Sequence, residues 1–146
     1  PNVNVNFIQV SDVGVDLAIL LKQRVEAGEK VVIVGDRTST TSPGRVVYAE
    51  FLGQQAPFSQ GPFILASLLE CPVYYLFCLK DGDKYRLIFE HVSDKLKFAR
   101  KTRQADIGEL INQYAQRLEY FCLLYPYQWF NFFDFWQEDH KVERKK

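Results

Sequence analysis

The sequence predicts an α/β fold in which helices flank a mainly parallel sheet and an antiparallel hairpin strand is added to it. Residues 31–34, Val-Val-Ile-Val, form an uninterrupted β-branched run, which is typical of a strand buried on both faces. A helix-spaced apolar pattern precedes this run, and a second apolar run at residues 72–79 follows it. A length of 146 residues is enough for one domain around one core.

The first part of the chain predicts a strand, a helix and a second strand. Residues 3–10 alternate apolar and polar side chains at first and indicate a strand. Ser11 suits the N-cap of a helix, and apolar residues then recur at helical spacing until Gly28, which fits the position just past the helix end. With the strand at residues 31–34 these elements make a βαβ unit, whose crossover should be right-handed.

The second part predicts a short helix, a hairpin and a long helix. Residues 45–51 read as extended, and Ser-Gln-Gly-Pro at residues 59–62 begins a short helix with a proline in its first turn. Asp-Gly-Asp at residues 81–83 joins the run at 72–79 to an alternating stretch at 85–92, as in an antiparallel hairpin. From about Thr102 to Tyr125, apolar residues recur every three or four positions and predict an amphipathic helix.

The chain then becomes strongly aromatic. Ten of the 17 residues from 120 to 136 are aromatic. Such residues can cap the core or can lie at a membrane interface, and we favour packing because buried aromatic side chains dominate core energetics. We therefore expect one domain over residues 1–136 and a charged, flexible tail over residues 137–146.

Composition argues against several classes of protein. Acidic and basic residues balance at 18 each, so no basic patch indicates nucleic-acid binding. Cys71, Cys78 and Cys122 form no Cys-x-x-Cys pair, which favours a reducing compartment and three small buried apolar side chains over disulfides or a metal site. No apolar run has the length of a membrane span and no signal segment opens the chain. We expect a cytoplasmic protein, with peripheral contact to the inner face of the cell membrane as an open alternative.

Catalytic residues are scarce. Only His91 and His140 could act as histidine bases, and we identify no plausible nucleophile or orienting carboxylate for either from the sequence. The nucleophile-elbow, phosphate-loop and dinucleotide motifs are absent. The chain begins at Pro1 and has no methionine, which fits removal of an initiator and equally fits a piece of a longer protein. The sequence predicts no complete catalytic constellation, no metal site and no cofactor.

The candidate substrate-binding residues are predicted from position. Ligands of open α/β sheets bind beyond the carboxyl ends of the strands, and Asp36 and Arg37 follow the run at 31–34 directly. Arg37 could hold a phosphate or carboxylate with two hydrogen bonds, and Asp36 could fix that arginine or the loop. Arg45 lies in the following loop, and the helix start at Gly61 offers backbone amides to an anion. The competing interpretation, a loop-capping aspartate, solvated arginines and a helix start that binds nothing, stays open.

Five segments form an ordered block of motifs along the chain: Val31-Val32-Ile33-Val34-Gly35-Asp36-Arg37, Phe51-Leu52-Gly53 with Ala56-Pro57-Phe58, Gly61-Pro62-Phe63-Ile64-Leu65-Ala66, Cys71-Pro72-Val73 and Tyr125-Pro126-Tyr127-Gln128-Trp129. This block resembles the C-terminal half of the bacterial lipid A biosynthesis acyltransferases, in the lysophospholipid acyltransferase superfamily. The family block has a strand ending in Asp-Gln, an apolar loop, Gly-Pro before a helix, a Pro-Val strand and a closing Pro-x-Gln-Trp motif.

The resemblance has clear departures. Arg37 takes the place of the family's glutamine, and aromatic residues replace a basic cluster after the closing tryptophan. The family's catalytic His-x4-Asp/Glu lies upstream of this block and is absent here, since Leu96 and Lys145 stand five residues after the two histidines. The departures fit a subgroup of acyltransferase-like proteins better than the lipid A enzymes themselves.

The resemblance implies acyl transfer from an acyl carrier protein or coenzyme A thioester to a lipid or glycolipid acceptor. This chain would supply the sheet, walls of the acyl pocket and anion-holding residues, and would be inactive alone. Two alternatives remain: a lipid- or protein-binding module without chemistry, and a subunit that completes an enzyme in trans. Further expectations are peripheral membrane contact and self-association through an uncovered strand edge.

Overall fold

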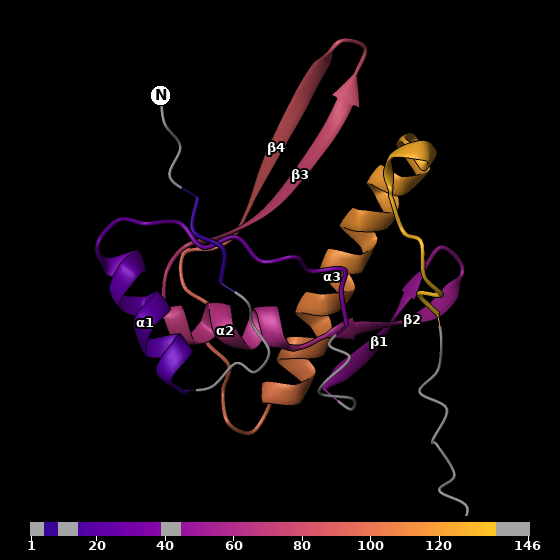
Figure 1. The fold of residues 1–146 in the computed structure, drawn as a ribbon. Helices are drawn as coiled ribbons and strands as arrows, with labels where there is room; N and C mark the ends of the chain where they lie inside the picture. The colour runs from indigo at the N-terminus through magenta and orange to yellow at the C-terminus, as the bar shows by residue number, and fades with distance from the viewer. Residues whose placement is uncertain (1–4, 9–14, 39–44, 137–146) are drawn as a thin grey trace, which may run out of the picture.

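The computed structural model describes residues 5–8, 15–38 and 45–136. Figure 1 shows α1 and α2 side by side, with α3 running past two separate hairpins. The elements follow the order α1 (Val15–Glu26), β1 (Val46–Phe51), β2 (Gln54–Ser59), α2 (Gly61–Leu69), β3 (Val73–Asp81), β4 (Lys84–Ser93), α3 (Arg103–Leu124) and a 3₁₀ turn, η1 (Pro126–Gln128).

The α/β class is confirmed, but the described residues form no parallel sheet. They form two antiparallel pairs instead, β1 with β2 and β3 with β4. Residues 5–8 and 31–34 are not strands, and the rest of the strand predicted at 3–10 lies outside the described residues. Val32 is 77% exposed and Val34 59% exposed, whereas Val31 packs against the cluster between α1 and α2. The β-branched run is therefore not buried on both faces as a strand of a parallel sheet would be. The predicted βαβ unit is therefore not formed among the described residues.

The elements that depend on local signals are confirmed. Gly28 ends the first helix at φ +90, and its N–H donates to the carbonyl of Val25 at 2.9 Å. Helix α2 begins at Gly61 with a proline in its first turn, and α3 begins immediately after Thr102. The β3–β4 hairpin turns at Gly82, which has a φ of +60. The predicted start of the first helix at Ser11 lies outside the described residues.

The β1–β2 hairpin was only half predicted, since its second strand contains Pro57 and carries no clear alternation. Its two-residue turn, Leu52-Gly53, has positive φ values of 50 and 80, as a type I′ turn requires. The N–H of Leu52 donates to a carboxylate oxygen of Glu119 at 2.6 Å. Because Glu119 belongs to α3, this bond ties the strained turn to the long helix.

One core cluster joins both hairpins to α3. Phe51 and Ile111 are fully buried in it, at 0% exposure. A smaller cluster between α1 and α2 contains the buried residues Leu21, Leu65 and Leu69. The prediction of three buried cysteines is wrong for Cys78, which lies exposed on β3; Cys71 is half-buried and Cys122 is buried.

Candidate functional site

Three of the segments that make up the ordered motif block meet at one place. The indole N–H of Trp129 donates to a carboxylate oxygen of Asp36 at 3.1 Å, across 93 residues of sequence. The same indole ring lies edge-on to the ring of Phe51, with 5.1 Å between centroids. We call Asp36, Phe51 and Trp129 the motif junction, because they come from the strand-end, loop and closing motifs respectively.

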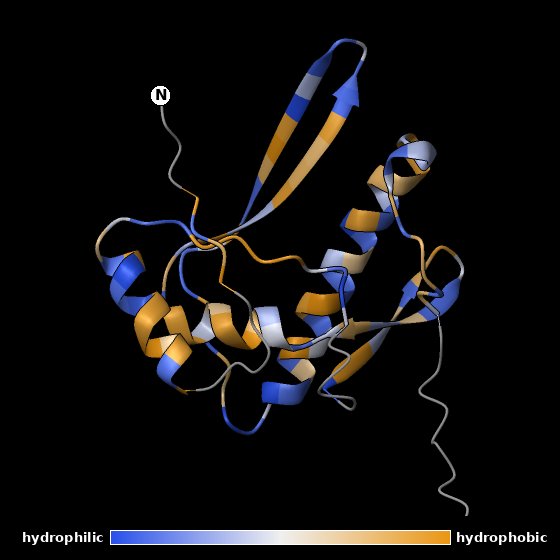
Figure 2. Cartoon of the chain, in the orientation of Figure 1, coloured by the Kyte–Doolittle hydropathy of each residue, from blue (hydrophilic) through white to orange (hydrophobic). Residues whose placement is uncertain are grey.

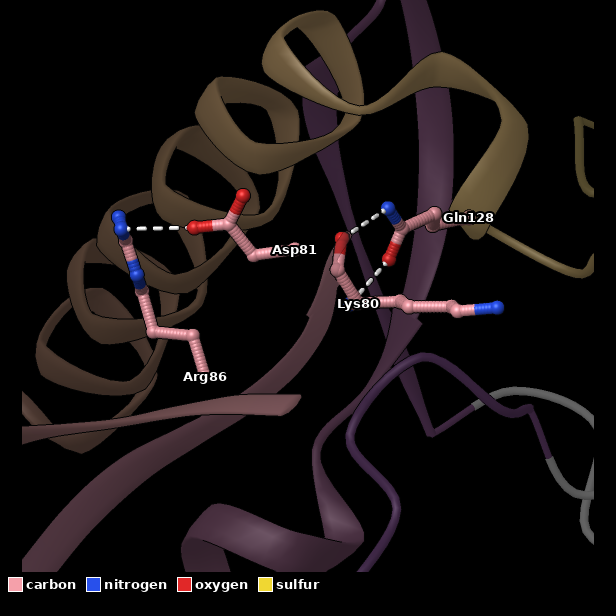
Figure 3. A network of polar contacts seen from close by, with 4 residues as sticks. All are labelled: Lys80, Asp81, Arg86 and Gln128. Carbon is pink, nitrogen blue, oxygen red and sulfur yellow. Dashed lines mark hydrogen bonds and ion pairs between the residues drawn. The ribbon is translucent and has the colours of Figure 1, made fainter. Parts of the chain in front are cut away.

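Gln128 fixes the closing motif on the end of β3. Its side-chain oxygen accepts from the Lys80 N–H at 2.6 Å, and its side-chain nitrogen donates to the Lys80 carbonyl at 2.8 Å (Figure 3). The amide thereby meets both backbone groups of one residue, as a neighbouring strand would. The Arg86–Asp81 ion pair at 2.8 Å lies beside this contact but is exposed, so we expect it to contribute less than about 1 kcal/mol.

Gly35 allows the backbone before Asp36 to lie against α3. A Cβ at this glycine would stand 2.8 Å from the Cζ and hydroxyl oxygen of Tyr114. Burial, and secondarily the negative charge of Asp36, raises the pKa of Tyr114. The same two causes raise the pKa of Cys122 to about 11, with Glu119 adding to them. The Asp36 carboxylate is itself only 16% exposed.

The Arg37 guanidinium contacts three groups of the chain, and the side chain is also partly exposed to solvent. Its guanidinium donates to the Phe130 carbonyl at 3.4 Å, lies 5.0 Å from the centroid of the Phe133 ring, and stands 3.8 Å from the Asp36 carboxylate. The side chain is 44% exposed. A guanidinium has five N–H donors, so the described contacts leave donors that could take a phosphate or carboxylate in a two-pronged bond. The anion-holding role expected of Arg37 from its position stays a prediction.

The other two predicted site residues lie apart from this arrangement. Arg45 has an exposed side chain, and its carbonyl accepts from the Gln60 N–H at 3.0 Å. The Gly61 N–H donates to the Ser59 hydroxyl at 3.2 Å, so this amide already has a partner. Among the described residues, no hydrogen bond or ion pair joins either residue to Asp36 or Arg37.

The expectation that no orienting carboxylate serves either histidine is wrong for His91, whose partner stands only three residues further along the chain. A ring nitrogen of His91 lies 3.0 Å from a carboxylate oxygen of Asp94, and Asp94 is 95% exposed. The pair could orient a base, but it lies in water at the base of the β3–β4 hairpin, without a hydroxyl or thiol bonded to it in the described part of the chain. His140 lies outside the described residues. Within the described ranges no three His, Cys, Asp or Glu side chains gather as a metal site would require.

Comparison with known proteins adds no relative. No protein-family model, curated protein or solved structure matches this chain. None of the described helices has the length and apolar character needed to cross a membrane.

The long-range contacts around Gly35, Asp36 and the end of β3 were not predicted. Trp129 and Gln128 were quoted as part of a motif, but nothing in their local pattern says which residues they contact. Tyr114 was read as one of many apolar positions on the long helix. The usable signal was the pairing of Gly35 with Asp36, because a glycine at a strand end often permits close approach of another group.

Proposed function

We propose that this chain is the C-terminal, non-catalytic part of an acyltransferase-type domain that moves a fatty acyl group from a thioester to a lipid or glycolipid hydroxyl. The observation that carries the proposal is the motif junction. Asp36 and Phe51, from two of the motifs, both contact Trp129 of a third, through a 3.1 Å hydrogen bond and a 5.1 Å ring contact. A shared structural role for these motifs would account for the meeting.

The exposed run at residues 31–34 supports the same proposal. Three consecutive β-branched side chains in water are unfavourable, because each large aliphatic side chain gains about 1.5–3 kcal/mol on full burial. Val32, Ile33 and Val34 are 77%, 42% and 59% exposed. In a larger acyltransferase-type domain this run would be a strand of a mainly parallel sheet, with neighbours supplied by other segments.

The proposed reaction needs a base that this chain lacks. A histidine in an upstream His-x4-Asp/Glu would take the proton of the acceptor hydroxyl, and the hydroxyl oxygen would attack the thioester carbonyl. The carbon–sulfur bond then breaks, the proton passes to the leaving thiolate, and an ester and a free thiol result. Arg37 would hold an anionic group, such as the phosphate of the acyl carrier's prosthetic arm or of the acceptor.

The exposed aromatic residues between 130 and 133 favour a second candidate, a lipid-binding module that catalyses no reaction. Phe130 and Phe132 are 67% and 91% exposed, their ring centroids are 6.5 Å apart, and Arg37 lies beside their neighbour Phe133. Aromatic side chains next to a cation suit the membrane interface, where lipid phosphates meet acyl chains. Both candidates place the protein in the cytoplasm at the inner membrane surface.

Substitution of Arg37 tests the acyl-transfer candidate. In a protein that joins this chain to a region carrying His-x4-Asp/Glu, we expect Arg37→Ala to lower acyl transfer at sub-saturating donor at least tenfold, since a charge-assisted bidentate contact is worth about 1.5–3 kcal/mol. Arg100→Ala, which removes an exposed arginine that is not a candidate site residue, is the matched control and should leave the rate unchanged. Equal rates for both variants would count against the anion-holding role.

A further inference from the structure

The β3–β4 hairpin has two apolar faces, and the described residues cover only one of them. On the inner face the Tyr75 hydroxyl donates to the Leu110 carbonyl of α3 at 3.2 Å, and the Phe77 ring lies 4.5 Å from that of Phe121. The outer face is built from successive cross-strand pairs: Tyr74 with His91, Leu76 with Phe89, Cys78 with Leu87, and Lys80 with Tyr85. Figure 2 shows hydrophobic colour along both strands that gives way to hydrophilic colour at the tip.

This outer face is large for an uncovered surface. Its exposed fractions are 52% for Tyr74, 43% for Leu76, 72% for Tyr85, 60% for Leu87 and 63% for Phe89. At roughly 200 Å² for a large side chain, these five leave on the order of 600 Å² in water. That equals the upper range for the largest apolar patch of a monomer, about 300–600 Å². Two such faces together reach about 1,200 Å², the lower bound of specific protein interfaces.

We propose that the outer face of the β3–β4 hairpin is the contact surface for a second copy of this chain. Its central pairs, Leu76 with Phe89 and Cys78 with Leu87, carry no formal charge. A twisted two-stranded ribbon can pack on an identical ribbon at about 10 Å, as the two layers of a β-sandwich do. A two-fold axis brings the same patch of each copy into contact. The two contacting surfaces are therefore equal in area and equally apolar.

Charge at the two ends of the face favours one direction of this packing. Lys80 lies at the tip end of the face, and Asp94, which is 95% exposed, lies at the base end beside His91. A two-fold axis through the middle of the face places the Lys80 end of each copy against the Asp94 end of the other. The opposite direction would bring like charges together and is disfavoured.

Cys78 gives this geometry a specific readout. It is exposed and pairs with Leu87 near the middle of the outer face, so the two-fold axis brings the two Cys78 thiols close together. A short bismaleimide should join two chains through Cys78 at low micromolar protein. Cys78→Ser should abolish the covalent dimer, whereas Cys71→Ser, which changes a half-buried thiol outside the hairpin, should retain it.

Sedimentation velocity over a range of micromolar concentrations completes the test. We expect a dimer for the unmodified chain and about thirtyfold weaker association for Phe89→Lys, the loss typical of a central interface residue. Phe132→Lys is the control, because it changes an aromatic residue that is 91% exposed but lies outside the hairpin. Circular dichroism checks that each variant is folded.

Two results would overturn the proposal. One is a chain that sediments as a monomer at every concentration. The other is a dimer that Phe89→Lys and Phe132→Lys weaken equally, which would place the contact elsewhere. If Phe89→Lys fails to fold, the cross-linking experiment decides instead. Packing through this face is contradicted if the unmodified chain gives no covalent dimer, or if the Cys78→Ser variant still gives one.

Discussion

The indole of Trp129 and the carboxylate of Asp36 are joined by a 3.1 Å hydrogen bond across 93 residues of sequence. This bond connects the segment after α1 to the segment after α3. It holds the chain in place just after residues 31–34, next to Arg37.

Trp129→Phe should destabilise the chain by about 1–2 kcal/mol. The substitution retains an aromatic ring beside Phe51 but removes the N–H, so the half-buried Asp36 carboxylate loses a charge-assisted hydrogen bond. Urea unfolding followed by circular dichroism measures the change. Asp36→Asn, which retains an oxygen acceptor, should cost less than Asp36→Ala, and equal stability of Trp129→Phe and the unmodified chain would contradict a structural role for the bond.

Gly35→Ala should cost about 1–3 kcal/mol through overpacking. The added Cβ would lie 2.8 Å from two atoms of Tyr114, a partly buried ring whose packing against the core cluster restricts its movement. The check is a double-mutant cycle with Tyr114→Leu, in which the second substitution should recover part of the loss caused by the first. Strict additivity of the two effects would mean that the Gly35 backbone does not lie against Tyr114.

The aromatic segment should separate into a buried part and an exposed part. Phe135 is 2% exposed and its ring lies 5.5 Å from that of Phe51, so Phe135→Ala should cost about 3–5 kcal/mol. Phe132 is 91% exposed, and Phe132→Ser should change the unfolding free energy by less than about 0.5 kcal/mol.

The same segment allows a test of membrane contact. Phe132→Ser combined with Phe133→Ser should reduce co-sedimentation with anionic phospholipid vesicles while the protein stays folded. Phe130, which is 67% exposed, is a further residue whose substitution can be tested by the same co-sedimentation measurement. Unfolding of the double variant would show instead that these two rings belong to the core.

Alkaline pH should destabilise the chain through Cys122 and Tyr75. Burial raises the pKa of Cys122 from 9.0 to about 11 and that of Tyr75 from 10.0 to about 12. Since both folded values exceed the unfolded ones, the unfolded chain releases these protons first. The contribution is complete below about pH 9 and is lost as pH rises towards 12. Urea midpoints between pH 8 and 11 measure the decline, which Cys122→Ala should make shallower; an unchanged slope would show that Cys122 is not the group responsible.

Local patterns in the sequence were sufficient for most individual elements. The long helix and the β3–β4 hairpin were predicted because helical spacing, alternation and the turn at Gly82 all lie within short windows. Strand β2 was missed because Pro57 and the apolar stretch around it lack alternation. The run at residues 31–34 was assigned to a strand because β-branched residues are typical of strands buried on both faces. A strand also needs neighbouring strands to pair with, and the local sequence does not show whether these exist.

The site was predictable only in part, for a similar reason. Arg37 and Asp36 were found because they follow an apolar run, and the structure shows one of them exposed and the other held by an indole. The contacts of Trp129 and Gln128 depend on chain segments 93 and 48 residues away, and no local pattern encodes such separations.

Acyl transfer by the purified chain, measured with a radiolabelled acyl thioester and a lysophospholipid or glycolipid acceptor, tests the central claim most directly. We expect no turnover from these 146 residues and turnover when an upstream region carrying His-x4-Asp/Glu is joined to them, because a general base contributes about 10²–10⁴-fold and the upstream region also positions the acceptor. Turnover by the isolated chain that His91→Ala abolishes would contradict the account, since it would make the His91–Asp94 pair the catalytic base.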